Sequence, residues 1–337
     1  MPHTYTIAIP MAGLGTRMRP HTWSKPKPLI HLAGRTVLDY VLEQFHTLPR
    51  FSQAEFALIL GPNQREQVEP YVVSHHGDKN VRYFLQEEMR GQSPALLLAR
   101  GILKGRMLMA FSDTLIETNL AALDSEELDG VAWVQRVPDP RRFGVAETDE
   151  NGLIRRLIEK PQEMHNNLAL VGFYYFREGQ ALMEAIEEQM ARDVALKGEY
   201  YLVDAINIMI ERGAQFRVEM VDVWLDSGKP DALLETNRYL LANGADNSEA
   251  AMERKNVMVI PPVFIHPQAE VAGCVIGPHV SIDEGAQLTN TVIANSIVES
   301  DARVSHMVLE DALIGRRAVL TGRAQAFNIA DDSWIEL

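Results

Sequence analysis

The last third of the chain carries a hydrophobic repeat that fits neither an ordinary helix nor a flat sheet. Its aliphatic residues recur at gaps of five or six, whereas a helix has a period of 3.6 and a half-buried strand a period of 2. A period near six is typical of a parallel β-helix, whose stacked coils direct one aliphatic side chain inward per face. Ten gaps at three per coil predict roughly three coils, and an irregular β-rich tail is the alternative. The positions are Ile265, Val271, Ile276, Ile282, Leu288, Ile293, Val298, Val304, Leu309, Ile314 and Leu320.

The first two thirds of the chain alternate short apolar runs with segments of helical spacing. This order predicts an α/β fold built of βαβ units, with a parallel sheet and right-handed crossovers. The expected strands are 5–10, 55–60, 81–85, 106–111, 131–137, 145–148, 153–159 and 170–176. The expected helices are 37–45, 64–75, 94–103, 180–189, 201–212 and 231–241.

The length of 337 residues exceeds the size at which single cores usually stop growing, so two domains are expected. The polar stretch 242–255 has the composition of a linker. We therefore expect an α/β domain over residues 1–242 and a β-helix with a C-terminal tail over residues 256–337.

Charge and cysteine content narrow the class of function. The net charge is −14, from 46 acidic and 32 basic residues, which argues against general nucleic-acid binding. A small phosphate ligand needs only a few local cations. Cys274 is the only cysteine, so a disulfide within one chain is impossible and a reducing compartment fits. With no signal peptide and no apolar run near the roughly 20 residues that span a bilayer, a cytoplasmic protein is expected, with no membrane partner.

Residues 9–29 (IPMAGLGTRMRPHTWSKPKPL) have the pattern of an anion-binding loop. Gly13 and Gly15 follow an apolar run, and glycine lets backbone N–H groups approach an anion without a Cβ in the way. Arg17 is suited to forked contacts with phosphate oxygens. Lys27 lies between two prolines that stiffen its backbone. The third glycine of the dinucleotide-binding fingerprint is absent.

Residues 13–29 resemble the signature of the sugar nucleotidyltransferases, roughly GxGTRLxPxTxxxPKPL, with Met18 in place of leucine. The similarity covers almost the whole chain. It is greatest to the long form of the glucose-1-phosphate thymidylyltransferases, which ends in a left-handed β-helix. The resemblance implies a Rossmann-like nucleotidyltransferase domain with a mixed, mainly parallel sheet, followed by a short left-handed parallel β-helix. Further matching segments are 142–145, 159–161, 171–174, 197–199, 224–230 and 331–333.

The resemblance implies transfer of a nucleotidyl group from dTTP or UTP to a sugar 1-phosphate, expected to be glucose 1-phosphate, with release of pyrophosphate. The attacking phosphate oxygen is already an anion, so the reaction needs positioning and cations and no general base. Arg17 and Lys27 would neutralise the triphosphate, and Lys160 would hold the sugar phosphate. Asp113 and Asp226 would hold Mg²⁺, which prefers oxygen ligands.

The resemblance also implies the residues that recognise the two substrates. Gln86 would read the base, because its amide can donate to O4 and accept from N3–H of thymine or uracil. The other implied nucleotide contacts are Ala12, Gly13, Gly15, Thr16 and Gly91. The implied sugar contacts are Gly144, Glu159, Gly172 and Glu199.

Two segments depart from the family pattern. Ser112 and Thr114 flank Asp113, where the family usually has glycine and asparagine. Residues 92–94 read Gln-Ser-Pro, where small residues are usual. These departures leave the specificity for base and ribose open.

Other functions stay open at this stage. One is a catalytically silent regulatory or scaffold subunit of the same fold, which the presence of all four phosphate and metal residues disfavours. Another is a guanylyltransferase acting on mannose 1-phosphate. An acyltransferase built on the β-helix is disfavoured because three coils are few and His266, His279 and His306 fall at scattered positions. The expected partners are a nucleoside triphosphate and a sugar 1-phosphate, and the β-helix could mediate a homo-oligomer.

Overall fold

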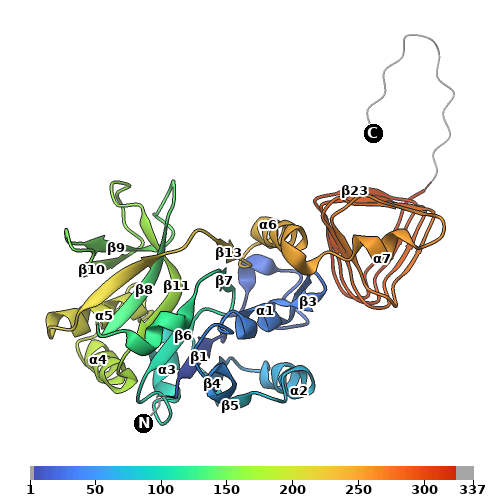
Figure 1. Ribbon diagram of the computed structural model, residues 1–337. Coiled ribbons are helices and arrows are strands. Elements are labelled where there is room, and N and C mark those ends of the chain that lie inside the picture. The colour runs from blue at the N-terminus through green and yellow to red at the C-terminus, as the bar shows by residue number, and fades with distance from the viewer. Residues whose placement is uncertain (1–3, 324–337) are drawn as a thin grey trace. The chain divides into compact units, whose positions relative to one another are not determined.

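The computed structural model describes residues 4–323 (Figure 1). The chain forms two compact units: one holds the residues up to 30 and 36–232, and the other holds 31–35 and those from 233 onward. Across residues 4–323, no helix is both long and apolar enough to cross a bilayer. The family-like segment expected at 331–333 lies outside the described residues.

The first unit is built on a mixed sheet that runs β10-β9-β11-β6-β1-β4-β5, with β8 joining β11 to β12. Strands β10 and β11 run opposite to the others, so the sheet is mainly parallel, as expected. The fully buried run LALVGFYYF forms β11, which is typical of a strand covered on both faces. The strands are β1 (Thr6–Pro10), β4 (Glu55–Leu60), β5 (Asn80–Leu85), β6 (Met107–Ala110), β8 (Gly130–Arg136), β9 (Gly144–Thr148), β10 (Ile154–Glu159), β11 (Leu168–Phe176) and β12 (Phe216–Met220).

Among the helices of this unit, α3 packs on β1 and β4 of the sheet. Helices α4 and α5 pack on each other, α5 also packs on β10, and their inward side chains share one core with β8 and β11. The ranges are α1 (Val37–Glu43), α2 (Arg65–His75), α3 (Gln92–Leu98), α4 (Gly179–Ala191), α5 (Leu202–Glu211) and, at the boundary between the units, α6 (Pro230–Leu240). The expected strands and helices are confirmed, although α3 begins two residues earlier and ends five residues sooner than predicted. Before residue 230, the strands that were not predicted are the short β2 (His31–Leu32), β3 (Arg35–Thr36), β7 (Thr114–Ile116) and β13 (Trp224–Asp226), together with β12.

The second unit is the β-helix that the repeat predicts. Its coils stack into three parallel four-stranded sheets, consistent with a left-handed β-helix (Figure 1). The first sheet is β14 (Val257–Val259), β17 (Cys274–Ile276), β20 (Val292–Ala294) and β23 (Val308–Glu310). The second is β15 (Val263–Ile265), β18 (Val280–Ile282), β21 (Ile297–Val298) and β24 (Leu313–Ile314). The third is β16 (Glu270–Ala272), β19 (Gln287–Thr289), β22 (Arg303–Ser305) and β25 (Val319–Thr321).

The repeat places the inward side chains correctly but undercounts the coils. Every predicted aliphatic position falls in one of these strands, and Ile276, Ile293 and Leu309 stack in register. The described residues contain four strands per sheet, so there are four coils where roughly three were expected. The missed strand is β14, whose Val259 begins the column below Ile276.

The stretch 242–255, which has the composition of a linker, is folded onto the first coil. It contains the short helix α7 (Ser248–Met252), which packs against β14 and β15. The Asn247 side chain pairs with the backbone of Ile265 in both directions, at 2.9 and 2.8 Å. This segment therefore covers the first end of the β-helix core.

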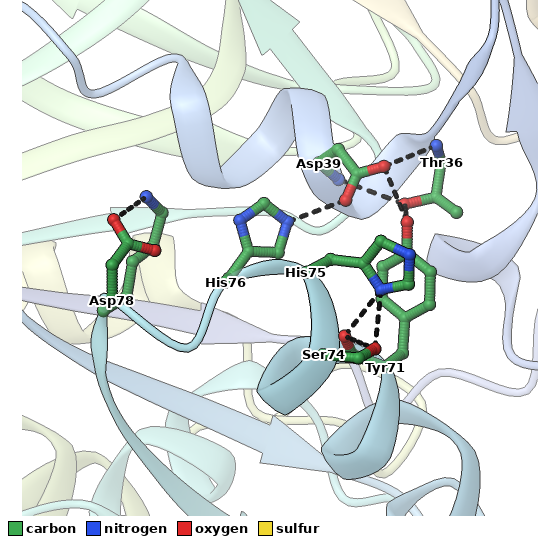
Figure 2. A network of polar contacts seen from close by, with 8 residues as sticks. Thr36, Asp39, Tyr71, Ser74, His75, His76 and Asp78 are labelled. Atoms are coloured by element: carbon green, nitrogen blue, oxygen red, sulfur yellow. Dashed lines mark hydrogen bonds and ion pairs between the residues drawn. The ribbon is translucent and has the colours of Figure 1, made fainter.

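A buried polar network joins α1 to α2 in the first unit (Figure 2). Asp39 and Thr36 form a capping box at the start of α1. The Asp39 carboxylate also contacts the ring of His76 at 2.7 Å and accepts a hydrogen bond from the Tyr71 hydroxyl at 2.7 Å. Burial opposes the charge of Asp39, but the contacts with His76, Tyr71 and Thr36 outweigh it and lower its pKa from 3.8 to about 2.

The lowered pKa makes Asp39 a source of stability that depends on pH. The stabilisation is complete above the unfolded value of 3.8 and is lost as the pH falls toward about 2. We expect Asp39→Asn to lower the free energy of unfolding by about 2 kcal/mol at pH 6. The difference from the parent should shrink as the pH drops below about 4, as measured by urea unfolding. Asp78→Asn, at an exposed position, is the control, and equal stabilities of the two variants would contradict the assignment.

The β-helix core offers a second test of stability. Ile293 is fully buried, whereas its neighbour Val292 points outward with 45% of its surface exposed. Ile293→Ala should destabilise the unit by about 2–5 kcal/mol through lost burial and a residual cavity. Val292→Ala should change stability by less than about 0.5 kcal/mol. Thermal unfolding of both variants measures the contrast, and similar losses would be inconsistent with the observed register.

Candidate functional site

A cavity of about 590 Å³ opens where β1, β5 and β6 end. Ligands of open α/β sheets bind at the carboxyl ends of the parallel strands. All but one of the site residues expected from the sequence line this cavity. They are Ala12, Gly13, Gly15, Thr16, Arg17, Lys27, Gln86, Gly91, Asp113, Gly144, Glu159, Lys160, Glu199 and Asp226.

The turn after β1 is shaped by Gly15. Its φ is +59°, and a Cβ there would lie 3.0 Å from the Thr22 side chain. The Gly15 carbonyl accepts a hydrogen bond from the Thr22 hydroxyl at 2.8 Å and another from the Met18 N–H at 2.9 Å. The short 3-10 helix Thr16–Met18 follows, and it carries Arg17 to the cavity wall.

The two aspartates are brought together by a small ladder between β7 and β13. The strands run antiparallel, and Asp226 at the end of β13 lies opposite the first residue of β7. The Ser227 N–H then donates to the Asp113 carbonyl at 3.0 Å. Residues far apart in the sequence are thereby placed on one wall of the cavity.

Positive side chains converge on the same wall. Lys27 is 9% exposed and forms an ion pair with Asp113. The Gly228 backbone lies beside these charged side chains, and its N–H donates a hydrogen bond to the Asp226 carboxylate at 2.6 Å. A Cβ on Gly228 would lie 3.2 Å from the Arg17 guanidinium and 3.3 Å from the Lys27 ammonium. Glycine at this position therefore leaves space among the charged groups.

The electrostatics of the aspartate pair favour an added cation. Burial raises the pKa of Asp226, and the neighbouring Asp113 charge raises it further, against the opposing effects of Lys27 and Arg17. Two carboxylates beside a large cavity fit Mg²⁺, which usually takes one or two carboxylates and completes its shell with phosphate and water oxygens. Residues 4–323 contain no cluster of three or more metal-ligating His, Cys, Asp or Glu side chains. A metal here would complete its shell with oxygens of water or of a bound phosphate.

The wall formed by the loop after β5 holds Gln86. Its side chain is buried, and its amide donates to the Gly91 carbonyl at 3.0 Å. Gly91 has a φ of +107°, and a Cβ there would lie 2.5 Å from the Tyr200 carbonyl. Since the Tyr200 N–H also donates to the Arg90 carbonyl at 2.9 Å, this loop is fixed to the segment before α5.

The opposite wall carries Glu159 and Lys160 at the end of β10. The Lys160 N–H donates to the Phe143 carbonyl at 2.9 Å. A Cβ on Gly144 would lie 3.2 Å from the Glu159 carboxylate, so Gly144 allows that group to approach the backbone. Burial raises the pKa of Glu159, although the charge of Lys160 opposes the shift.

Comparison with known proteins assigns the chain to a family. Residues 8–243, which include the whole cavity lining, match the family model described as nucleotidyl transferase. The chain belongs to the nucleotidyl transferase family. The resemblance to sugar nucleotidyltransferases seen in the sequence is therefore confirmed.

Some relatives of this nucleotidyl transferase match along nearly their full length. The low-salt glycan biosynthesis nucleotidyltransferase Agl11 of Haloferax volcanii is 29% identical over 334 residues, covering 91% of each chain. A glucose-1-phosphate thymidylyltransferase of Streptomyces griseus is 28% identical over 332 residues, covering 92% of this chain and 91% of the relative. The crystal structure of a putative glucose-1-phosphate thymidylyltransferase from Bacillus anthracis matches with a TM-score of 0.61 at 22% identity, covering 70% of this chain and 95% of that one. This last likeness shows the fold alone.

One expected sugar contact of this nucleotidyl transferase does not reach the cavity. Gly172 lies in β11, and a Cβ there would meet the Phe111 ring at 2.2 Å. The Phe111 ring lines the cavity in its place. Gly172, with a φ of +82°, provides the space into which that ring packs.

The two departures from the family pattern have structural counterparts. Thr114 is buried and donates to the Val171 carbonyl at 3.1 Å, which ties β7 to β11. The Gln92 side chain accepts a hydrogen bond from the Leu202 N–H at 3.1 Å and so caps the start of α5. Ser112 and Gln92 both line the cavity.

Several aromatic and charged residues of the cavity were not predicted as site residues. Phe143 and Trp224 meet edge to face with ring centroids 5.0 Å apart. Arg142 and Tyr201 line the same cavity. Three of them, Arg142, Phe143 and Trp224, fall within segments that already matched the family. The spacing of residues in those segments does not distinguish a side chain that lines the site from one that only packs in the fold.

Proposed function

We propose that this nucleotidyl transferase joins dTTP or UTP to a sugar 1-phosphate, with glucose 1-phosphate as the first candidate, and releases pyrophosphate. The observation that carries the proposal is the convergence of Arg17, Lys27, Asp113 and Asp226 on one wall of the cavity, with Lys160 on another. Relatives from two Streptomyces species are described as glucose-1-phosphate thymidylyltransferases. A silent scaffold would have no need of this charged group.

In the proposed reaction an oxygen of the sugar phosphate attacks the α-phosphorus of the triphosphate. A new P–O bond forms, the bond from the α-phosphorus to the oxygen bridging to the β-phosphorus breaks, and pyrophosphate leaves with the bonding electrons. No proton has to move, so the barrier comes from bringing anions together and from charge on the leaving group. Arg17 and Lys27 would offset the charge of the triphosphate and the leaving pyrophosphate. Lys160 would hold the incoming phosphate.

Asp113 and Asp226 would hold Mg²⁺ in this scheme. When bound, the ion supplies positive charge to the phosphate oxygens and helps to orient them. Lys27 already contacts Asp113, so the ammonium group and the metal would share the negative charge of the aspartate pair. The proposed setting is the cytoplasm, where the single cysteine stays reduced.

Metal binding by Asp226 can be tested by removing its charge. Asp226→Asn should lower kcat at least about 100-fold, because the metal would lose one of its two carboxylate ligands. The change should leave the thermal unfolding midpoint within a few degrees of the parent. Asp222→Asn, an exposed neighbour outside the cavity lining, is the control and should behave like the parent. Activity of Asp226→Asn within a few-fold of the parent would refute the metal role.

Base selection can be tested with a pyrophosphate-release screen. Four nucleoside triphosphates are each combined with several sugar 1-phosphates, including those of glucose and mannose, in the presence of Mg²⁺. We expect dTTP and UTP to react far better than GTP or ATP. Gln86→Ala should lower kcat/KM for the pyrimidine triphosphates about 10- to 100-fold, through loss of the amide contacts. Glu87→Ala, at the exposed neighbouring position, is the control. A preference for GTP with mannose 1-phosphate would point to a guanylyltransferase instead.

A further inference from the structure

We propose that Tyr201 positions the Lys160 ammonium for the phosphate of the sugar substrate, a role that rests on the proposed function. Tyr201 lines the cavity directly before α5, and Lys160 lines it directly after β10, the strand on which α5 packs. The tyrosine would act through the lysine and need not touch the reacting atoms. It is therefore a positioning residue.

The contact between the two side chains has two parts. The Lys160 ammonium donates a hydrogen bond to the Tyr201 hydroxyl at 2.7 Å. The ammonium nitrogen also lies 4.3 Å from the centroid of the Tyr201 ring, within the range of a cation–π interaction. The ring and its hydroxyl thus restrict a long, flexible side chain, 45% of which is exposed.

Glu159 competes with Tyr201 for the same ammonium group. Its carboxylate lies 3.3 Å from the Lys160 nitrogen. A lysine drawn fully onto this carboxylate would lose much of its attraction for a phosphate. By accepting one N–H, the neutral Tyr201 hydroxyl holds the ammonium without adding negative charge. Burial opposes the charge of Lys160, but Tyr201 and Glu159 outweigh it and raise its pKa, so the lysine stays a cation.

The backbone at Tyr201 is itself fixed by hydrogen bonds to two neighbouring helices. Its carbonyl accepts a hydrogen bond at 2.8 Å from Gln189, a fully buried side chain of α4. The next residue, Leu202, donates its N–H to Gln92 of α3 at 3.1 Å. Two helices therefore fix the start of α5, and the ring that holds Lys160 is attached to this fixed point. A preorganised cation loses less conformational freedom when the phosphate binds.

The test compares two adjacent tyrosines. Tyr201→Phe keeps the ring and removes the hydroxyl, and Tyr201→Leu removes both parts of the contact. Tyr200→Phe is the matched control. The Tyr200 hydroxyl donates a hydrogen bond to Asp193 at 2.7 Å, and neither of these two residues lines the cavity. Steady-state kinetics are measured for both substrates, with whichever sugar 1-phosphate the parent uses. Binding of that sugar 1-phosphate is measured separately by calorimetry.

We expect Tyr201→Phe to raise KM for the sugar 1-phosphate about 10-fold and weaken its binding to match, as loss of one charge-assisted hydrogen bond implies. Tyr201→Leu should have a larger effect. KM for the triphosphate and kcat should stay within about 2-fold of the parent, which a general structural defect would not produce. In a Lys160→Met background, Tyr201→Phe should have no further effect, because the two residues act as one unit.

The outcomes separate this inference from the proposed function. If the parent is active and Tyr201→Phe matches the parent and Tyr200→Phe, the positioning role is overturned while the function stands. The role is also overturned if Tyr201→Phe still weakens sugar-phosphate binding after Lys160 has been replaced. If the parent neither turns over nor binds any sugar 1-phosphate, the proposed function fails and the role of Tyr201 fails with it.

Discussion

The pairing of β7 with β13 is the constraint on which the rest of the site depends. These two three-residue strands place Asp113 and Asp226 on one wall of the cavity, although burial and the Asp113 charge raise the pKa of Asp226. Lys27 and Arg17, which lie in two short 3-10 helices that follow β1, offset part of this repulsion. An arrangement that keeps like charges together costs stability, and such sites persist only when the surrounding structure holds them. In the proposed function, a cation bound between the two carboxylates would relieve this repulsion.

Much of the fold could be predicted because its signals are local and repeated. Buried runs such as residues 170–176 read as strands, and the period near six located the inward residues of eleven β-helix strands. The missed strand, β14, lies between the polar stretch 242–255 and two prolines, although its Val259 stands six residues before Ile265 and so continues the period. The coil count was therefore too low, although the repeat itself was identified correctly.

The site was less predictable, since its residues meet through contacts that leave no period in the sequence. The resemblance located the charged residues one by one, but it gave no sign of the ladder that joins β7 to β13. A three-residue strand is too short for a recognisable alternation of apolar and polar positions. Tyr201 was missed for a similar reason, because its contact with Lys160 depends on the packing of α5 beside β10. Gly172 stays a predicted sugar contact, and its packing against the Phe111 ring likewise leaves no pattern in the sequence.

The residues after Gly91 show how a departure from a family pattern can carry structural meaning. Gln92 fills a position where a small residue is usual, and its amide caps α5 beside Tyr201. Gly91 meanwhile packs against the Tyr200 backbone so closely that no side chain fits. The loop that presents Gln86 and the segment that presents Tyr201 are thus fastened to each other. If the proposed function holds, a change that reshapes the loop carrying Gln86 should also move Tyr201 and the Lys160 side chain that it contacts. The specificities for the two proposed substrates would then be physically coupled.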